Sequence, residues 1–108
     1  MIEIRQYVDR QGRNCFEQWF KDQEGVTRAR IVVALERLAR GSFSSTKSLG
    51  AGVFELRLDF GPGYRVYFGK DGEAIVILLG GGTKKRQQSD IDGAHALWQQ
   101  YKQQKREE

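Results

Sequence analysis

The side chains most able to do chemistry are five cations in the second half of the chain, three of which form a basic triplet. They are Arg57, Arg65, Lys84, Lys85 and Arg86. Arg57 and Arg65 stand in successive stretches where apolar and polar residues alternate, and side chains two positions apart share one face of a strand. Because guanidinium groups bind phosphate oxygens in pairs and stay charged, this pattern predicts a phosphate-binding polar face. Tyr67 lies on the same face and could stack on a base, so the expected ligand is RNA.

Metal-free cleavage of RNA is the reaction that this set of residues suits. The 2′-hydroxyl must be driven onto the neighbouring phosphorus, with cations around the pentavalent phosphate. Arg65 is the best-placed cation, with Arg57 as its expected cross-strand neighbour. Lys84 and Lys85 come where the following strand ends. One donor preorganised at a developing oxyanion is typically worth roughly 10² to 10³ in rate. Because Arg65 projects from the polar face, it is expected to reach a phosphate without supporting the core.

The proton acceptor is left open by the sequence. The one histidine, His95, falls beside the apolar stripe of the last predicted helix, so we expect it at a helix boundary rather than in the site. Glu55 and Asp59 share the polar face with the arginines, where they could accept a proton or form cross-strand ion pairs. Lys84 or Lys85 is a further alternative, because crowded positive charge favours the neutral amine.

Further RNA contacts are predicted outside the catalytic set. Arg30 and Arg37 belong to an arginine-rich helix, where they either clamp ribosomal RNA phosphates or form a solvated helix face. Arg86 adds a cation beyond the last strand. Tyr67 either stacks on a base or packs beside Arg65.

The composition is that of one basic domain. A chain of 108 residues with 39% apolar residues has the size of a single domain, residues 1–108. Its 18 Lys and Arg against 14 Asp and Glu give a net charge of +4, which is compatible with a polyanionic partner. A single cysteine, Cys15, excludes an internal disulfide, and with one histidine no structural zinc or other cofactor is expected. Without a signal peptide or a membrane-spanning run, we expect no membrane contact and a cytoplasmic location.

Hydrophobic periodicity predicts the element order β-α-α-β-β-β-α. The expected strands are Ile2–Val8, Val53–Phe60, Tyr64–Phe68 and Ile75–Leu79, the last of them central and covered on both faces. The expected helices run from an N-cap at Asn14 to Asp22, from Gly25 to a stop at Gly41, and from Ser89 onward. The stretch from Ser42 to Ser48 is expected to be a loop. Since consecutive strands with short connections pair antiparallel, we expect an α+β fold: a small, mainly antiparallel sheet with helices packed on its apolar face.

Three segments resemble the RelE/ParE toxin superfamily. They are G-V-F-E-L-R from Gly52 to Arg57, G-P-G-Y-R-V-Y-F from Gly61 to Phe68, and L-G-G-G-T-K-K-R from Leu79 to Arg86. More closely, they resemble its HigB-like branch of phage-related addiction-module killer proteins. The resemblance covers nearly the whole chain and implies a RelE-like fold, with Arg65 matching the strand arginine of RelE-type nucleases. It also implies an antitoxin encoded beside the toxin, expected to be of helix-turn-helix type, with operator DNA bound only through the antitoxin complex.

The resemblance implies the toxin of a type II toxin–antitoxin system, and the residues favour one activity within that class. The superfamily holds both ribosome-dependent mRNA endonucleases, or mRNA interferases, and inhibitors of DNA gyrase. A single surface is expected to carry Arg57, Arg65 and the cluster of Lys84, Lys85 and Arg86. This favours the endonuclease that inhibits translation, since a gyrase binder needs no phosphate-holding pocket. Ribosome and mRNA are therefore expected partners. A ParE-like gyrase inhibitor stays open as an alternative, as does a non-catalytic relative that acts only in complex with its antitoxin.

Overall fold

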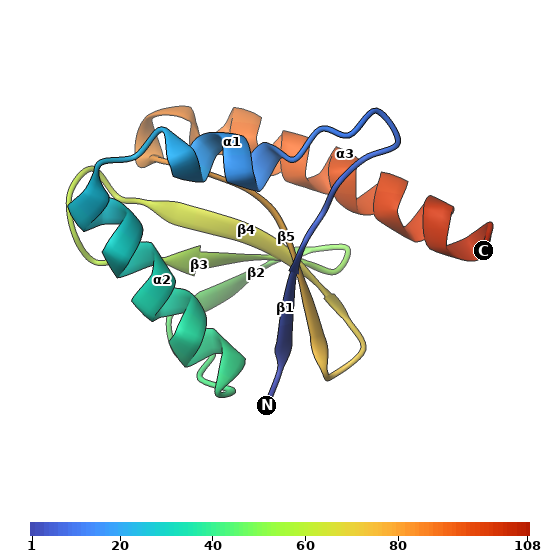
Figure 1. The fold of residues 1–108 in the computed structure, drawn as a ribbon, viewed down its shortest axis with the longest axis horizontal. Helices are drawn as coiled ribbons and strands as arrows, with labels where there is room; N and C mark the ends of the chain where they lie inside the picture. The colour runs from blue at the N-terminus through green and yellow to red at the C-terminus, as the bar shows by residue number, and fades with distance from the viewer.

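The fold is a five-stranded sheet flanked by three helices, as Figure 1 shows for residues 1–108 of the computed structural model. The strands are β1 (Glu3–Gln6), β2 (Thr46–Gly50), β3 (Val53–Arg57), β4 (Arg65–Asp71) and β5 (Ile75–Gly82). The helices are α1 (Cys15–Lys21), α2 (Gly25–Ala39) and α3 (Gln87–Arg106), with a short 3-10 helix, η1 (Lys84–Arg86), between β5 and α3. The predicted α+β class is confirmed, and the fold is compatible with the RelE type.

Local signals in the sequence explain where the helices begin. The Asn14 side chain accepts a hydrogen bond from the backbone N–H of Glu17 at 3.0 Å, which satisfies a donor that the first turn of α1 leaves unpaired. In α2, Ile31 and Leu38 are seven positions apart and both buried, as the apolar stripe of a helix requires. The last helix begins at Gln87 rather than at Ser89, because η1 leads directly into it without a side-chain cap.

The strands lie in the order β1-β5-β4-β3-β2. Three neighbouring pairs are antiparallel, whereas β1 runs parallel to β5 at one edge. The sheet is therefore mixed, although most of its pairings agree with the antiparallel prediction. β5 is an interior strand whose residues 76–79 are all buried, which agrees with the prediction of a strand covered on both faces.

The sequence prediction missed β2. Part of the stretch expected as a loop, together with Leu49 and Gly50, forms this edge strand, which pairs with β3. Its side chains are mostly exposed, so it lacks the apolar alternation that would reveal a strand. The element order thus contains one strand more than predicted. β3 in turn ends at Arg57 rather than at Phe60. Beyond that point the N–H of Leu58 still donates a hydrogen bond of 3.0 Å to the backbone oxygen of Tyr64, just before β4.

One face of the sheet carries the predicted apolar core. Phe16 from α1 and Ile31 from α2 pack there in one cluster with Leu56, Val66 and Phe68 of β3 and β4. These strand residues are the ones that the alternation assigned to the apolar face.

The opposite face is covered by α3, so the prediction that the helices pack on one face is wrong. Trp98 and Ala94 of α3 form a second buried cluster with Val53, Tyr67 and neighbours on β5. Trp98 lies flat against Gly69, where a Cβ atom would fall under 3.0 Å from the indole ring. The face that looked polar in β3 and β4 therefore contains enough apolar surface to bind a helix.

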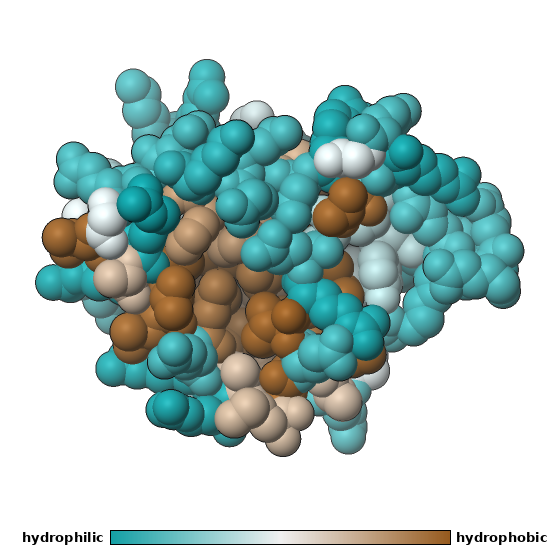
Figure 2. All heavy atoms as spheres, in the orientation of Figure 1, coloured by the Kyte–Doolittle hydropathy of each residue, from teal (hydrophilic) through white to brown (hydrophobic).

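Hydrophobic side chains also reach the surface over α2 and between this helix and the sheet, whereas the C-terminal part of α3 is hydrophilic (Figure 2). No helix combines the length and the apolar character that crossing a membrane requires.

Candidate functional site

Arg57 and Arg65 face each other across β3 and β4 and share one carboxylate. Their Cα atoms are register partners, and both side chains point toward Glu55 on the same face. Glu55 Oε2 lies 3.5 Å from Arg65 Nε and 3.9 Å from Arg57 Nε. The side chains of Glu55 and Arg65 are only 2% and 7% exposed, whereas that of Arg57 is 57% exposed. Glu55 is thus the cross-strand ion-pair partner that the sequence allowed, and it is not available to solvent.

The guanidinium of Arg65 is also held from the neighbouring turn. Its Nη1 donates a hydrogen bond of 2.8 Å to the backbone oxygen of Gly63, which adopts a φ of +79°. A Cβ atom at Gly63 would lie 3.2 Å from Arg65 Nη1 and 3.4 Å from Lys84 Cβ. The positive φ favours a glycine here, and the turn brings Lys84 close to the arginine. Lys84 is anchored through its backbone N–H, which donates to the oxygen of Pro62 at 3.3 Å.

A cavity of about 320 Å³ opens beside these residues. We call it the Arg65 cavity; Arg57, Asp59, Tyr64 and Arg65 are among its lining residues, together with Gly63. Asp59 is the one carboxylate in this lining, and it is exposed to solvent. The arrangement places two arginine side chains along one small opening, which suits an oxyanion such as a phosphodiester.

The other two basic residues of the triplet lie outside this cavity. Lys85 and Arg86 are exposed in η1, alongside Lys84. Arg86 lies near Asp90 of α3, where burial raises the pKa of the Asp90 carboxyl although the Arg86 charge acts in the opposite direction. None of the three residues of the triplet, Lys84 included, belongs to the lining of the Arg65 cavity.

Tyr67 cannot stack on a base as predicted, because only 1% of it is exposed. It lies under α3, and its hydroxyl group has no hydrogen-bond partner. Burial, assisted by the negative charges of Asp90 and Glu55, raises the pKa of the hydroxyl to about 12. Of the two interpretations that the sequence left open, core packing is the one that agrees with the structure.

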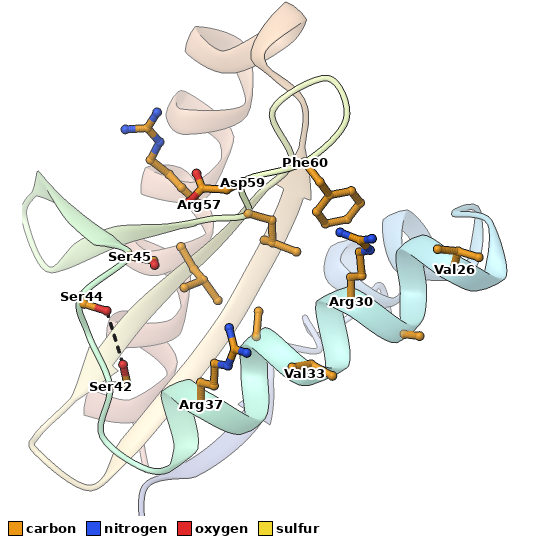
Figure 3. A pocket seen from close by; sticks show the side chains of 14 residues that line it. Val26, Arg30, Val33, Arg37, Ser42, Ser44, Ser45, Arg57, Asp59 and Phe60 are labelled. Carbon is orange, nitrogen blue, oxygen red and sulfur yellow. Dashed lines mark hydrogen bonds between the residues drawn. The ribbon is translucent and has the colours of Figure 1, made fainter.

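Arg30 and Arg37 line a second, larger hollow of about 580 Å³ between α2 and the segment that follows β3. We call it the α2 groove, and Figure 3 shows both arginines rising from α2 toward that segment. The guanidinium of Arg30 lies over the ring of Phe60, 4.7 Å from its centre. Arg57 lines both hollows, so the predicted RNA-binding arginines are connected to the Arg65 cavity through it.

His95 lines neither hollow; it is partly buried on α3. No group of three or more histidine, cysteine, aspartate or glutamate side chains comes together in a way that could hold a metal ion. Sequence reasoning missed Gly63 as a site residue. The signal for it was the G-P-G turn, because glycines in a turn indicate a backbone conformation that other residues rarely adopt.

Two comparisons with known proteins cover the elements that build this site. A family model described as "Phage derived protein Gp49-like (DUF891)" matches residues 18–99, a range that contains every residue of both hollows. An uncharacterized protein of Haemophilus influenzae is 41% identical over 86 residues, which make up 79% of this chain and 87% of that protein.

Proposed function

Because the chain belongs to the Gp49-like family of phage-derived proteins, which is of the RelE/HigB toxin type, we propose that it is the toxin of a type II toxin–antitoxin system. Within that class, we propose that it is an mRNA endonuclease that acts on the ribosome. The observation that carries this activity is that Arg57 and Arg65 both line the Arg65 cavity and approach the same carboxylate, with Lys84 beside Gly63 of the same lining.

The two arginines would hold the scissile phosphate. Glu55 and the Gly63 oxygen orient the Arg65 guanidinium before any ligand arrives, so its remaining N–H groups need little reorganisation when charge develops on the phosphate. Arg57 is more exposed and can adjust to the ligand. Gly63 presents no side chain, which allows a phosphate to approach the backbone closely.

The remaining steps fall to residues around the opening. Lys84 would stabilise the leaving 5′-oxygen, with Lys85 and Arg86 holding the flanking phosphates from η1. Asp59, the carboxylate in the cavity lining, is the group best placed to take the proton of the 2′-hydroxyl. Such a proton acceptor typically contributes roughly 10² to 10⁴ in rate.

We expect cleavage to depend on the ribosome. A site with a few cations and one exposed carboxylate does little to orient a flexible single strand. On the ribosome the mRNA is already held, so much of the orientation cost is met before the toxin binds. Membership of a toxin family also implies an antitoxin in general; for this chain we propose a helix-turn-helix antitoxin that carries the complex to operator DNA.

The test incubates the purified chain with mRNA, with and without programmed ribosomes, and maps the new 5′ ends. Cleavage within the reading frame only when ribosomes are present is the expected result. Arg57→Ala should reduce this cleavage, because it removes one of the two arginines that would hold the phosphate. The fold should survive, because this arginine is exposed and Arg65 still pairs with Glu55. Arg40→Ala is the matched control, since Arg40 is an exposed arginine that lines neither hollow.

Three outcomes would contradict the proposal. Equal cleavage in both tubes would exclude a need for the ribosome. A toxic chain that leaves mRNA intact but blocks supercoiling by DNA gyrase would support the inhibitor instead. A folded chain that does neither would support a non-catalytic relative.

A further inference from the structure

Two aromatic side chains line the Arg65 cavity beside the arginines. They are Phe60 and Tyr64, which stand directly before and directly after the turn of residues 61–63. Both are half-buried, whereas Tyr67, the residue from which base stacking was expected, is only 1% exposed. The cleavage reaction proposed above gives neither ring a role. Cations together with accessible aromatic faces are the two features that sites for single-stranded RNA combine.

The ring of Tyr64 is held in place by two neighbours. The centre of the Phe60 ring lies 5.1 Å from the centre of the Tyr64 ring, at an interplanar angle of 41°. The Tyr64 ring also lies against Gly61, where a Cβ atom would be only 2.8 Å from Tyr64 Cε2. Because the ring is positioned before any ligand arrives, stacking on it costs little conformational entropy.

Phe60 is supported in turn by α2. The guanidinium of Arg30 lies 4.7 Å from the centre of the Phe60 ring, which is a favourable cation–π geometry. Figure 3 shows Arg30 rising from the helix toward this ring. Arg30 lines the α2 groove, Phe60 lines both hollows, and Tyr64 lines the Arg65 cavity. A continuous set of contacts therefore leads from α2 to the ring that faces the phosphate-binding arginines.

We propose that Tyr64, backed by Phe60, is the stacking platform for one unpaired base of the RNA strand whose phosphate Arg57 and Arg65 bind. This stacking role rests on the proposed function, and it names the part of the substrate that the cations do not recognise. Arginines bind the phosphates of paired and unpaired strands alike. An aromatic face accepts only a base that has left its own stack, which restricts the site to single-stranded RNA. Arg30 acts through Phe60 as a positioning residue, in place of the RNA contact predicted from the sequence.

Base and phosphate are bound from one segment of backbone. Tyr64 directly precedes Arg65, whose guanidinium is tied to the backbone oxygen of Gly63. The ring and the guanidinium are thus both fixed relative to the same turn. A base stacked on Tyr64 places its nucleotide relative to the arginines, and this supplies part of the orientation that the reaction needs. Loss of the ring should therefore lower kcat as well as raise KM.

The experiment measures the binding of two short single strands to the full chain by NMR titration, which detects weak complexes. Both strands carry 2′-O-methyl groups, which prevent cleavage; one has all its bases, and the other is the same backbone without bases. Tyr64→Leu and Tyr64→Phe probe the platform. Phe43→Leu is the matched control: Phe43 is also half-buried against the core, with Lys70 over its ring at 4.7 Å, but it lines neither hollow.

The unaltered chain should bind the strand with bases about 10-fold more tightly than the strand without them, which is within the range that one base stack contributes. Tyr64→Leu should remove most of this difference, whereas Tyr64→Phe and Phe43→Leu should keep it. Arg57→Ala should weaken both strands by the same factor, because it removes a phosphate contact.

Several results would overturn the platform. Equal binding of the two strands by the unaltered chain, or binding of neither, would do so without any variant. A difference between the strands that survives in folded Tyr64→Leu would do the same. A free nucleoside monophosphate that binds as tightly as the strand with bases would overturn the assignment to an RNA strand.

Cleavage on programmed ribosomes separates the stacking role from the proposed function. Tyr64→Leu should lower kcat and raise KM, while Phe43→Leu should cut mRNA at the parent rate. If the parent chain cuts mRNA and Tyr64→Leu does so with unchanged kcat and KM, the platform is overturned and the endonuclease stands. A chain whose preference for bases depends on Tyr64 but which never cuts mRNA would overturn the proposed activity and leave the platform standing.

Discussion

Replacing Arg65 by an uncharged residue should lower the unfolding temperature of the protein, in addition to removing a cation of the proposed site. Arg65 and Glu55 form a buried pair at 3.5 Å, and one oxygen of Glu55 has no hydrogen-bond partner. Removing one member of such a pair typically costs about 3 to 5 kcal/mol, because the other charge stays buried without compensation. Arg57 still lies 3.9 Å from the carboxylate, so we expect the lower end of this range for Arg65→Met.

A loss of about 3 kcal/mol corresponds to a fall in Tm of roughly 12 °C for a domain of this size. Thermal unfolding followed by circular dichroism measures it directly. The double variant Glu55→Leu/Arg65→Met should recover most of the loss, since replacing both members of a buried pair by apolar residues is often neutral or stabilising. Arg57→Met is the control and should cost less than about 1 kcal/mol, because its side chain is mostly exposed.

The reasoning fails if Arg65→Met melts with the parent protein, or if the double variant melts below the single one. Either result would mean that Glu55 finds water or another partner in the folded state. If the prediction holds, loss of toxicity in Arg65→Ala says nothing about chemistry until stability has been restored by the second substitution. Arg65 is buried beside Glu55, so the same result would contradict the expectation from the sequence that Arg65 does not support the core.

Three further predictions follow from side chains around the sheet. Tyr67→Phe should keep or slightly raise the Tm and leave toxicity unchanged, because it removes a buried hydroxyl that has no partner; a loss of toxicity in a folded protein would return Tyr67 to the site. Gly69→Ala should destabilise the protein by about 1 to 3 kcal/mol in urea unfolding, since its methyl group would meet Trp98; an unchanged midpoint would show that α3 can shift freely. Hydrogen bonding to Lys105 is the main cause that lowers the pKa of Asp71 below its ordinary 3.8. The stability that Asp71 contributes is therefore present above that value and lost as the pH falls through the lowered pKa. Asp71→Asn should lower the urea midpoint at pH 7 and flatten its decline below about pH 4, and an unaltered acid profile would contradict this.

The alternation in β3 and β4 predicted which side chains share a face, because a period of two follows from strand geometry alone. It could not predict what covers each face. Glu55 and Arg65 look like solvent-facing residues in the sequence, yet both are buried. Elsewhere on the same face, Val53, Gly69 and apolar residues of β5 provide the surface on which Trp98 of α3 packs.

The site was predictable to the extent that strand register determines it. Arg57 and Arg65 were expected as cross-strand neighbours and are register partners. The closeness of Lys84 to Arg65 depends on the turn at Gly63, whose path a sequence pattern does not reveal. The placement of Arg30 and Arg37 on a groove shared with Arg57 depends on how α2 packs, which is again a tertiary property.

The parallel pairing of β1 with β5 has a consequence for the order in which the chain folds. Glu3 and Ile75 are register partners although they are 72 positions apart in the chain. Bringing such distant segments together costs on the order of 4 kcal/mol in loop-closure entropy, whereas the hairpins of β3, β4 and β5 form from near neighbours. The turn at Gly63, between β3 and β4, can therefore assemble first, and the N-terminal strand docks late. Until it does, β5 presents an unpaired apolar edge, which is the stage at which a nascent chain is most prone to aggregate.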